Sequence, residues 1–338
     1  MCVTVAEVAS AQSTAKYKAT RLPSQINGAA VGYAEINSRG DALYQSKRLA
    51  YILNSAGQSR LLSDSKVNMT RKDLAENGSV ALSTVLNSGE NGVGMYAEPD
   101  AILKPLAGPN YPGIFPQGVN TLGFVIGQLP KDTNATYIQK IGSAPVKIGP
   151  AMDIEGFNDS GAFVGNGSHA YYYSPETGLL QDPEGISTFH DIAADGTAVF
   201  RFFDDTIGFT EYGIFKPGTT TRRFGKFNGR TFVASRINKQ GFVLGELFDL
   251  HQATLWSERT GFVDLLSNTS GVPSDVFYMQ ALDIADNGNI LVSTNNGTYV
   301  LSQVPEPLSL ATIGVGMVGA IAWKRRLQTS CFVHRKPA

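Results

Sequence analysis

A short turn phrase recurs along this chain, and it constrains the fold more than any other feature. Each copy is an Asn- or Asp-rich tight turn that ends in glycine and leads into a short apolar segment. Asn and Asp side chains bond to nearby backbone, and glycine accepts the positive φ at which a hairpin closes. The turn glycines lie 35 to 47 residues apart, at Gly40, Gly78, Gly123, Gly161, Gly196, Gly241 and Gly288.

A second phrase follows the turns by roughly eight to twenty residues, as expected for the next strands of a hairpin repeat. It is clearest in 169–173 and 252–256, and each of these copies is followed by another turn ending in Gly178 or Gly261. A unit of about 40–45 residues with up to four short strands has the size of a β-propeller blade. We therefore predict an all-β fold in which residues 12–303 form a six- or seven-bladed propeller; an irregular β-sandwich array is the alternative.

The end of the chain has a three-part pattern. Val304 and the triplet Pro305-Glu306-Pro307 precede sixteen uncharged residues, 308–323, and the cations Lys324, Arg325 and Arg326 follow. A helix of sixteen residues rises about 24 Å, which nearly spans a hydrocarbon core. The positive-inside rule places the cations, and the tail 327–338, in the cytoplasm. We predict a single transmembrane helix over 308–323, with residues 12–303 on the far side of the membrane.

Residues 304–326 resemble the PEP-CTERM sorting signal of Gram-negative bacteria, with its Pro-Glu-Pro triplet, apolar span and basic cluster. The resemblance implies recognition at Pro305, Glu306 and Pro307 by an exosortase, a membrane transpeptidase. The chain departs from the family in continuing for twelve residues beyond Arg326. The turn and strand phrases in turn resemble the HAF-type repeats of bacterial extracellular proteins, most closely near Phe157 and Ile237; no activity is implied.

The N-terminus carries a weaker targeting pattern. Ala9-Ser10-Ala11 has the small-x-small form of a signal-peptidase site, but no basic region precedes it. We interpret residues 1–11 as the remnant of a longer signal peptide; a disordered terminus with a chance match is the alternative.

Composition and motifs exclude several classes of function. The net charge of −1 gives no electrostatic case for nucleic-acid binding, and Cys2 and Cys331 flank a body without cysteine, which excludes a disulfide framework or a Cys-based zinc site there. Gly314, Gly316 and Gly319 spell G-x-G-x-x-G, but they lie in the apolar span without a βαβ unit. We expect no cofactor and no metal site.

Candidate catalytic groups are few. The four histidines, His169, His190, His251 and His334, form no catalytic motif, and we interpret His169 and His251 as structural. Asp159, Asp195 and Asp286 fit turn formation better than calcium binding, Tyr171, Tyr172 and Tyr173 fit packing between blades better than sugar stacking, and Asp204, Asp205 and Glu211 have no demonstrable glycosidase spacing.

Three hypotheses for function remain. The first is a non-catalytic envelope or matrix protein that interacts with extracellular polysaccharide or surface proteins. The second is a propeller enzyme acting on extracellular polysaccharide, and the third is a passive spacer without a ligand. Carboxylates that converge in a central channel with raised pKa values would favour the enzyme, whereas an apolar or scattered polar lining would favour the interaction protein.

Overall fold

The computed structural model describes residues 16–26, 29–47, 49–62, 67–85, 91–204 and 209–304. The described residues up to Gln303 belong to one compact unit, and the chain divides after Gln303. The predicted signal-peptide remnant 1–11, the triplet and cations of the sorting signal, and the tail 327–338 lie outside the described residues. Where the structure does describe the chain, no helix is long and apolar enough to cross a membrane; the predicted span 308–323 is not among those residues.

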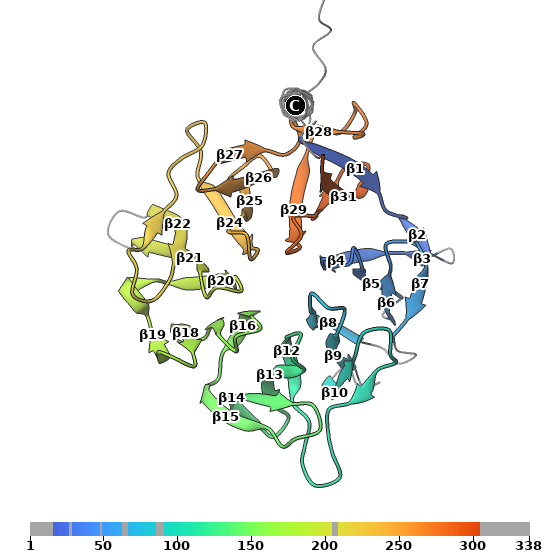
Figure 1. The fold of residues 1–338 in the computed structure, drawn as a ribbon, viewed down its shortest axis with the longest axis vertical. Helices are drawn as coiled ribbons and strands as arrows, with labels where there is room; N and C mark the ends of the chain where they lie inside the picture. The colour runs from blue at the N-terminus through green and yellow to red at the C-terminus, as the bar shows by residue number, and fades with distance from the viewer. Residues whose placement is uncertain are drawn as a thin grey trace, which may run out of the picture. The chain divides into compact units, whose positions relative to one another are not determined.

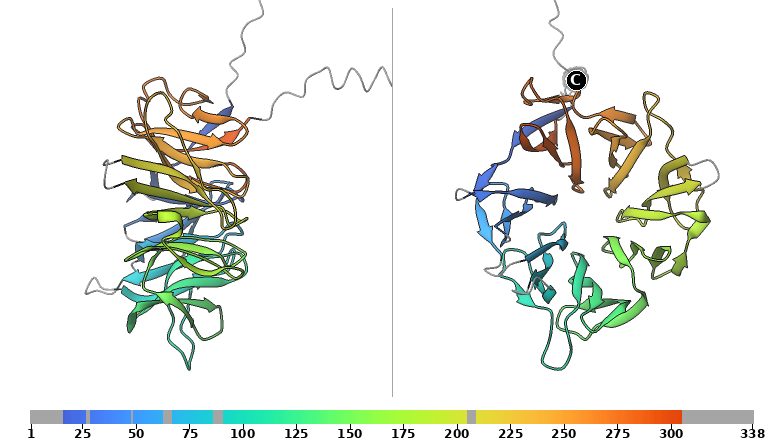
Figure 2. Two further views of the ribbon diagram at one scale, coloured as in Figure 1. Left: turned by 90° about the vertical axis from the view of Figure 1, so that its left-hand side faces the viewer. Right: turned by 180° about the vertical axis from the view of Figure 1, so that it is seen from behind.

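Seven four-stranded antiparallel sheets follow one another around a central axis within the described part of Tyr17–Gln303 (Figure 1). Five are separate sheets, and the last two are joined by a single parallel bridge between Gln252 and Met279. The predicted all-β repeat architecture is confirmed, and the number of blades is seven. Seen from the side, the propeller is a disc that is one blade thick (Figure 2).

The blades are numbered from the first complete sheet of the chain. Blade 1 is β4–β7 (Gly32–Ile36, Ala42–Ser46, Leu49–Leu53, Ser59–Leu61), blade 2 is β8–β11 (Val67–Leu74, Val80–Val85, Asn91–Ala97, Lys104–Pro105), blade 3 is β12–β15 (Phe115–Val119, Phe124–Leu129, Asp132–Lys140, Val146–Pro150) and blade 4 is β16–β19 (Asp153–Phe157, Phe163–Asn166, Ala170–Ser174, Gly178–Gln181).

The remaining blades follow in chain order. Blade 5 is β20–β23 (Thr188–Ile192, Ala198–Asp204, Phe209–Phe215, Arg222–Arg223), blade 6 is β24–β27 (Phe232–Ile237, Val243–Leu247, Gln252–Ser257, Gly261–Asp264) and blade 7 is β29–β31 (Met279–Ile284, Ile290–Thr294, Gly297–Gln303) with β1 (Tyr17–Arg21). Three two-residue strands lie outside the blades. β2 (Gln25–Ile26) pairs with β3 (Ala29–Ala30), and β28 (Thr269–Ser270) pairs with β1. A 3-10 turn spans Pro183–Gly185.

The N-terminal strand closes the ring, which the sequence phrases did not predict. β1 pairs antiparallel with β31, in a register that places Tyr17 opposite Gln303 and Arg21 opposite Tyr299. Blade 7 is therefore built from both ends of the propeller, and its outer strand comes from the beginning of the chain. The last residue of β31 directly precedes Val304, the first residue of the predicted sorting signal.

The core of the propeller lies between its blades. Seven clusters of buried apolar side chains occupy the seven interfaces between neighbouring blades in the described residues. Tyr171 and Tyr172 are almost fully buried in two of these interfaces, and Tyr173 stacks on Phe163. The predicted packing role of the three tyrosines therefore agrees with their positions.

All seven repeat glycines adopt positive φ in the turn between the first and second strand of a blade. We call the side of the ring that carries these turns the turn face. In blade 3 the Asn120 Oδ1 accepts hydrogen bonds from the backbone N–H groups of Leu122 and Phe124, at 3.1 and 3.0 Å. This local bonding is the reason why the phrase could be recognised in the sequence.

The same asparagines also join the blades. The Nδ2 of Asn37, Asn120, Asn158 and Asn238 each donates to the carbonyl at the equivalent position of the next blade, at Ala75, Asn158, Ala193 and Ala285. Blades 2, 5 and 7 have alanine at this position. In each of these blades an aspartate two residues earlier accepts the backbone N–H of the next blade instead: Asp73 from Val119, Asp191 from Ile237 and Asp283 from Ile36.

We call these seven hydrogen bonds the inter-blade ring. Each of the seven interfaces between neighbouring blades contains one of them. Four are made by an asparagine amide and three by an aspartate carboxylate. Because the bonds run between buried or half-buried groups, each lost bond leaves an unsatisfied polar atom in a site with little water.

We expect Asn120→Ala to destabilise the propeller by about 2–4 kcal/mol, because it removes two turn bonds and the bond to Asn158 from a side chain that is 2% exposed. Asn54→Ala is the matched control. Asn54 makes the same two turn bonds, to the N–H groups of Ala56 and Gln58, in an exposed turn. We expect it to cost about 1 kcal/mol. Chemical denaturation of the full chain measures both, and equal losses would contradict a role for Asn120 between blades.

Candidate functional site: the central channel

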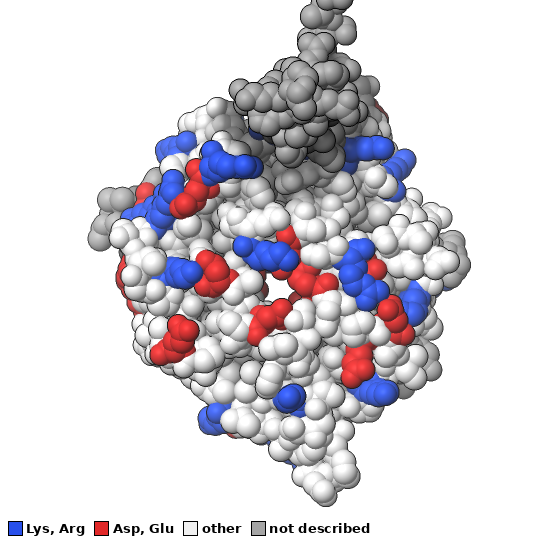
Figure 3. Space-filling view, viewed as in Figure 1, with Lys and Arg blue, Asp and Glu red and all other residues white. Residues whose placement is uncertain are grey.

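The first strands of the blades surround a central cavity of about 520 Å³. Figure 3 shows acidic side chains gathered around the hollow at the centre of the propeller. The lining includes one basic residue, Arg236, and nine acidic residues: Glu35, Asp73, Glu76, Asp153, Glu155, Asp159, Asp191, Asp283 and Asp286. The sequence analysis did not single out this channel lining, apart from Asp159 and Asp286.

Arg236 of β24 supplies the positive charge of the otherwise acidic channel lining. Its Nε lies 3.6 Å from Asp283 Oδ1, and its side chain is 35% exposed. Burial opposes the charged guanidinium, but the nearby carboxylates, led by Asp191 and Asp283, outweigh burial and raise the pKa of Arg236. The single cation therefore remains charged and offsets part of the repulsion among the carboxylates.

Two carboxyl groups of the channel have strongly raised pKa values. Burial raises the pKa of Asp283 to about 7, against the opposing effect of Arg236, and burial raises the pKa of Asp191 to about 6 in the same way. Burial also raises the pKa values of Glu155 and Glu76. Groups of this kind can exchange protons near neutral pH, which is the behaviour expected of general acids and bases.

Hydrogen bonds and an ion pair nevertheless occupy the oxygens of Asp191 and Asp283. Asp191 accepts Ile192 N–H at Oδ1 and Ile237 N–H at Oδ2, both at 2.8 Å. Asp283 accepts Ile36 N–H at Oδ2, also at 2.8 Å, and its Oδ1 faces Arg236. The two carboxyl groups with the largest shifts are thus members of the inter-blade ring, so their unusual environment has a structural cause.

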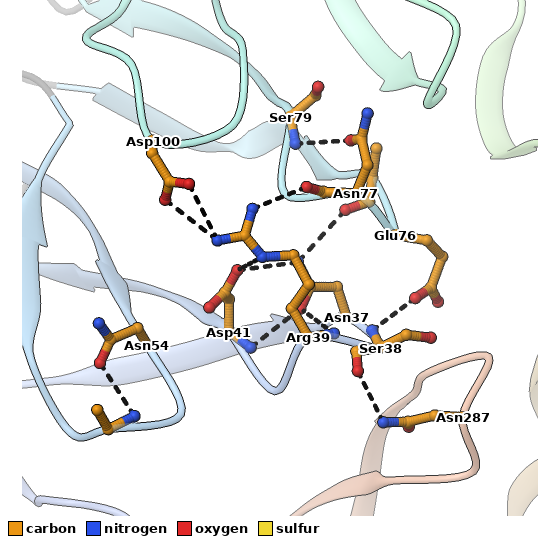
Figure 4. Close-up of polar contacts among 12 residues, drawn as sticks. Asn37, Ser38, Arg39, Asp41, Asn54, Glu76, Asn77, Ser79, Asp100 and Asn287 are labelled. Carbon is orange, nitrogen blue, oxygen red and sulfur yellow. Dashed lines mark hydrogen bonds and ion pairs between the residues drawn. The ribbon is translucent and has the colours of Figure 1, made fainter.

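A second layer of contacts lies at the rim of the channel on the turn face. Glu76 accepts the N–H groups of Ser38, at 2.6 Å, and Asp286, at 2.9 Å, and so joins blades 7, 1 and 2. Arg39 reaches across from blade 1, donating to the Asn77 carbonyl at 3.0 Å and pairing with Asp100 at 3.1 Å (Figure 4). Figure 4 also shows Asn287 donating to the Ser38 carbonyl at 2.9 Å.

The acidic turn residues named in the sequence analysis have different roles. Asp159 and Asp286 accept the N–H groups of Thr121 and Lys239 on the preceding blade, both at 2.8 Å, so they join blades as well as form turns. Asp195 accepts Thr197 N–H within its own turn. Glu211 pairs with Arg223 at 2.5 Å, away from the channel lining, and Asp205 lies outside the described residues.

The histidines do not form a joint site. His169 Nδ1 lies 2.5 Å from Asp182 in a loop of blade 4, and His251 Nδ1 lies 3.4 Å from Glu246 in blade 6. His190 stacks on Tyr212, and burial together with Arg201 and Arg236 lowers its pKa to about 4, so it is neutral. His334 lies outside the described residues. No group of three or more His, Cys, Asp or Glu side chains in the described ranges is arranged to hold a metal ion.

Comparison with known proteins supports the sorting motif and the fold. Residues 303–326 match the model of the PEP-CTERM protein-sorting motif. The match confirms the motif predicted from the sequence, and it implies export, a C-terminal membrane-anchoring signal and processing by an exosortase-like enzyme. No curated protein matches the chain. The resemblance to HAF-type repeats stays a prediction.

Solved structures with a similar fold share little sequence with the chain. A catalytically inactive virginiamycin B lyase from Staphylococcus aureus with quinupristin has a TM-score of 0.56 at 10% identity, covering 85% of this chain and 99% of its own. A streptogramin B lyase gives 0.54 at 9%, covering 87% and 100%. The β-propeller domain of the trilobed protease from Pyrococcus furiosus gives 0.54 at 13%, covering 83% and 98%. At these identities the similarity shows the fold alone.

We expect the raised pKa of Asp283 to appear in the pH dependence of stability. The folded state holds a proton that the unfolded carboxyl group releases near pH 4, so the free energy of unfolding falls as pH rises from about 4 to about 7. Asn does not titrate, so the stability difference between the native chain and Asp283→Asn should shrink over that window. For Asp191→Asn the corresponding window should end about one pH unit lower. Denaturation at a series of pH values measures both differences, and a difference that grows with pH would contradict the assignment.

Proposed function

We propose that the protein is an exported envelope or extracellular-matrix protein, released or re-anchored at its C-terminal sorting signal. Its propeller recognises glycan or protein partners without catalysis. The observation that carries the proposal is the sorting motif at 303–326, which begins at the last residue of β31. The repeat domain thus ends where the signal begins, so processing near the triplet would leave the propeller complete.

The non-catalytic role is supported by the bonding of the channel. A catalytic carboxyl group needs an oxygen directed at a substrate. The oxygens of Asp191 accept backbone N–H groups, and those of Asp283 hold Ile36 and Arg236. Structural networks of ion pairs perturb pKa values as catalytic sites do, so the shifts alone do not require an enzyme.

A propeller enzyme acting on extracellular polysaccharide is the second candidate. Its support is that carboxyl groups with raised pKa values converge in the channel beside Arg236. Asp153 and Glu155 line the channel and do not belong to the inter-blade ring. The enzyme hypothesis gives them a catalytic role, and the interaction hypothesis does not. Release of reducing ends from a polysaccharide, lost in Glu155→Gln with the fold intact, would establish the enzyme.

We expect replacement of Pro305-Glu306-Pro307 by three alanines to leave an unprocessed, membrane-retained form, because the processing enzyme would lose the element it recognises. Immunoblotting of fractions from the native host measures chain size and location. Deletion of 308–326 is the control for anchoring, and it should release soluble protein that keeps the triplet. Unchanged processing of the alanine variant would contradict recognition at the triplet.

A further inference from the structure

The N-terminal strand holds the end of the propeller that lies next to the sorting motif. Within the described residues, β31 pairs with β30 from Gly297 to Leu301, whereas it pairs with β1 from Tyr299 to Gln303 (Figure 1). The last two residues of β31, Ser302 and Gln303, therefore lie beyond the pairing with β30. Among the described strands, β1 is their pairing partner.

β1 contributes its first two residues to this pairing, with Tyr17 opposite Gln303 and Lys18 opposite Ser302. The side chain of Tyr17 also forms a hydrogen bond with the side chain of Gln303. We call the pairing of residues 17–18 with residues 302–303 the clasp.

The backbone directions show which group closes the clasp. The Leu22 N–H, directly after β1, donates to the Thr298 carbonyl of β31 at 2.9 Å. Successive N–H groups of a strand point to opposite edges, so the Lys18 N–H, four residues earlier, also faces β31. The Tyr17 N–H points to the other edge, where it donates to the Asn268 carbonyl at 3.1 Å. The bond from Lys18 is thus directed at Ser302.

Contacts on the other side of β1 keep the clasp in place. The Ser270 hydroxyl donates to the Tyr17 carbonyl at 3.2 Å, and β28 pairs in parallel with the start of β1. The Tyr17 side chain is 4% exposed and belongs to the same buried apolar cluster as Leu244 and Leu301. The clasp is therefore anchored in the core of blade 7.

The clasp lies close to the triplet in the sequence. One residue, the exposed Val304, separates Gln303 from Pro305, and the matched motif begins at Gln303 itself. Enzymes that cut a polypeptide act on exposed backbone whose hydrogen bonds are free or have opened. On the N-terminal side of the triplet, the closed propeller offers the backbone of Val304, and the clasp holds the residues before it.

Opening of the clasp alone would lengthen the accessible segment. It would free Ser302 and Gln303 and leave the pairing of β30 with β31 intact. Strand ends open at a much smaller free-energy cost than whole domains, so this local opening can occur in the folded protein. If the processing enzyme needs the open form, its apparent rate is reduced by the fraction of molecules that are open.

We propose that the clasp restrains processing at the sorting signal, so that the N-terminal strand regulates the release or re-anchoring of the C-terminal end. The proposal rests on the exosortase-like processing of the function proposed above, and it adds a regulatory element to it. The restraint acts on access to the backbone before the triplet, and recognition of the triplet itself is unchanged.

A linker between the clasp and the motif tests the restraint. A flexible six-residue Gly-Ser insertion between Gln303 and Val304 keeps Val304 beside the triplet and supplies free backbone before it. We expect processing of the full chain in the native host to accelerate by roughly fivefold, as for a clasp that is open in about one molecule in five. Pulse labelling and immunoblotting measure the rate. The same insertion after Arg326 controls for added length and should leave the rate unchanged.

A pair of substitutions at Lys18 tests whether the clasp is the cause. Lys18→Pro removes the N–H that faces β31, and Lys18→Ala keeps it. Both variants lose the same exposed side chain, so they differ in the backbone bond. We expect Lys18→Pro to accelerate processing and Lys18→Ala to process like the native chain. In the chain with the linker before Val304, Lys18→Pro should add no further acceleration, because the free backbone is already present.

The outcomes separate the clasp from the wider function. A linker that leaves the rate unchanged or lowers it would overturn the restraint, and so would equal rates for Lys18→Pro and Lys18→Ala. In these cases the native chain is still processed, so the proposed function stands. A native chain that is not processed at all would contradict the proposed function itself. Denaturation of each variant checks that the propeller is folded, and the linker variant leaves β1 unaltered.

Discussion

One hydrogen bond at each interface holds the first strands of this propeller around its channel. An asparagine amide reaches forward to the next blade in four interfaces, and an aspartate carboxylate accepts from the next blade in the other three. Buried apolar clusters between the blades provide most of the driving force, but they have no direction. The inter-blade ring provides direction, because each bond fixes the height of one blade against the next. Three of the nine acidic residues that line the channel, Asp73, Asp191 and Asp283, belong to this ring.

The local part of the fold could be predicted from the sequence, and the closure could not. Asn120 bonds to backbone two and four residues away, so the turn chemistry is visible in a short window. The pairing of Tyr17 with Gln303 joins residues at opposite ends of the chain, and no local pattern encodes it. Asp-x-Ala replaces x-x-Asn in the copies at 73–75, 191–193 and 283–285. No local pattern reveals what the aspartate does, because its bonding partner lies on another blade.

The candidate sites were harder to foresee for the same reason. Asp191 and Asp283 acquire raised pKa values only when the folded blades bury them, against the opposing effect of Arg236. The residues of the sorting motif, in contrast, are adjacent in the chain, and the match at 303–326 agrees with the sequence prediction.

In this protein a closed propeller directly precedes a C-terminal sorting motif, and the mature termini of the native protein test the proposed processing most directly. Fractionation of the native host followed by mass spectrometry of both ends should give a chain that still contains β1 at Tyr17–Arg21 and that ends near residues 304–307. Such a chain keeps the strand that closes blade 7 and has lost the apolar span. A mature protein that retains residues 308–338, or one that begins after Arg21, would contradict the account.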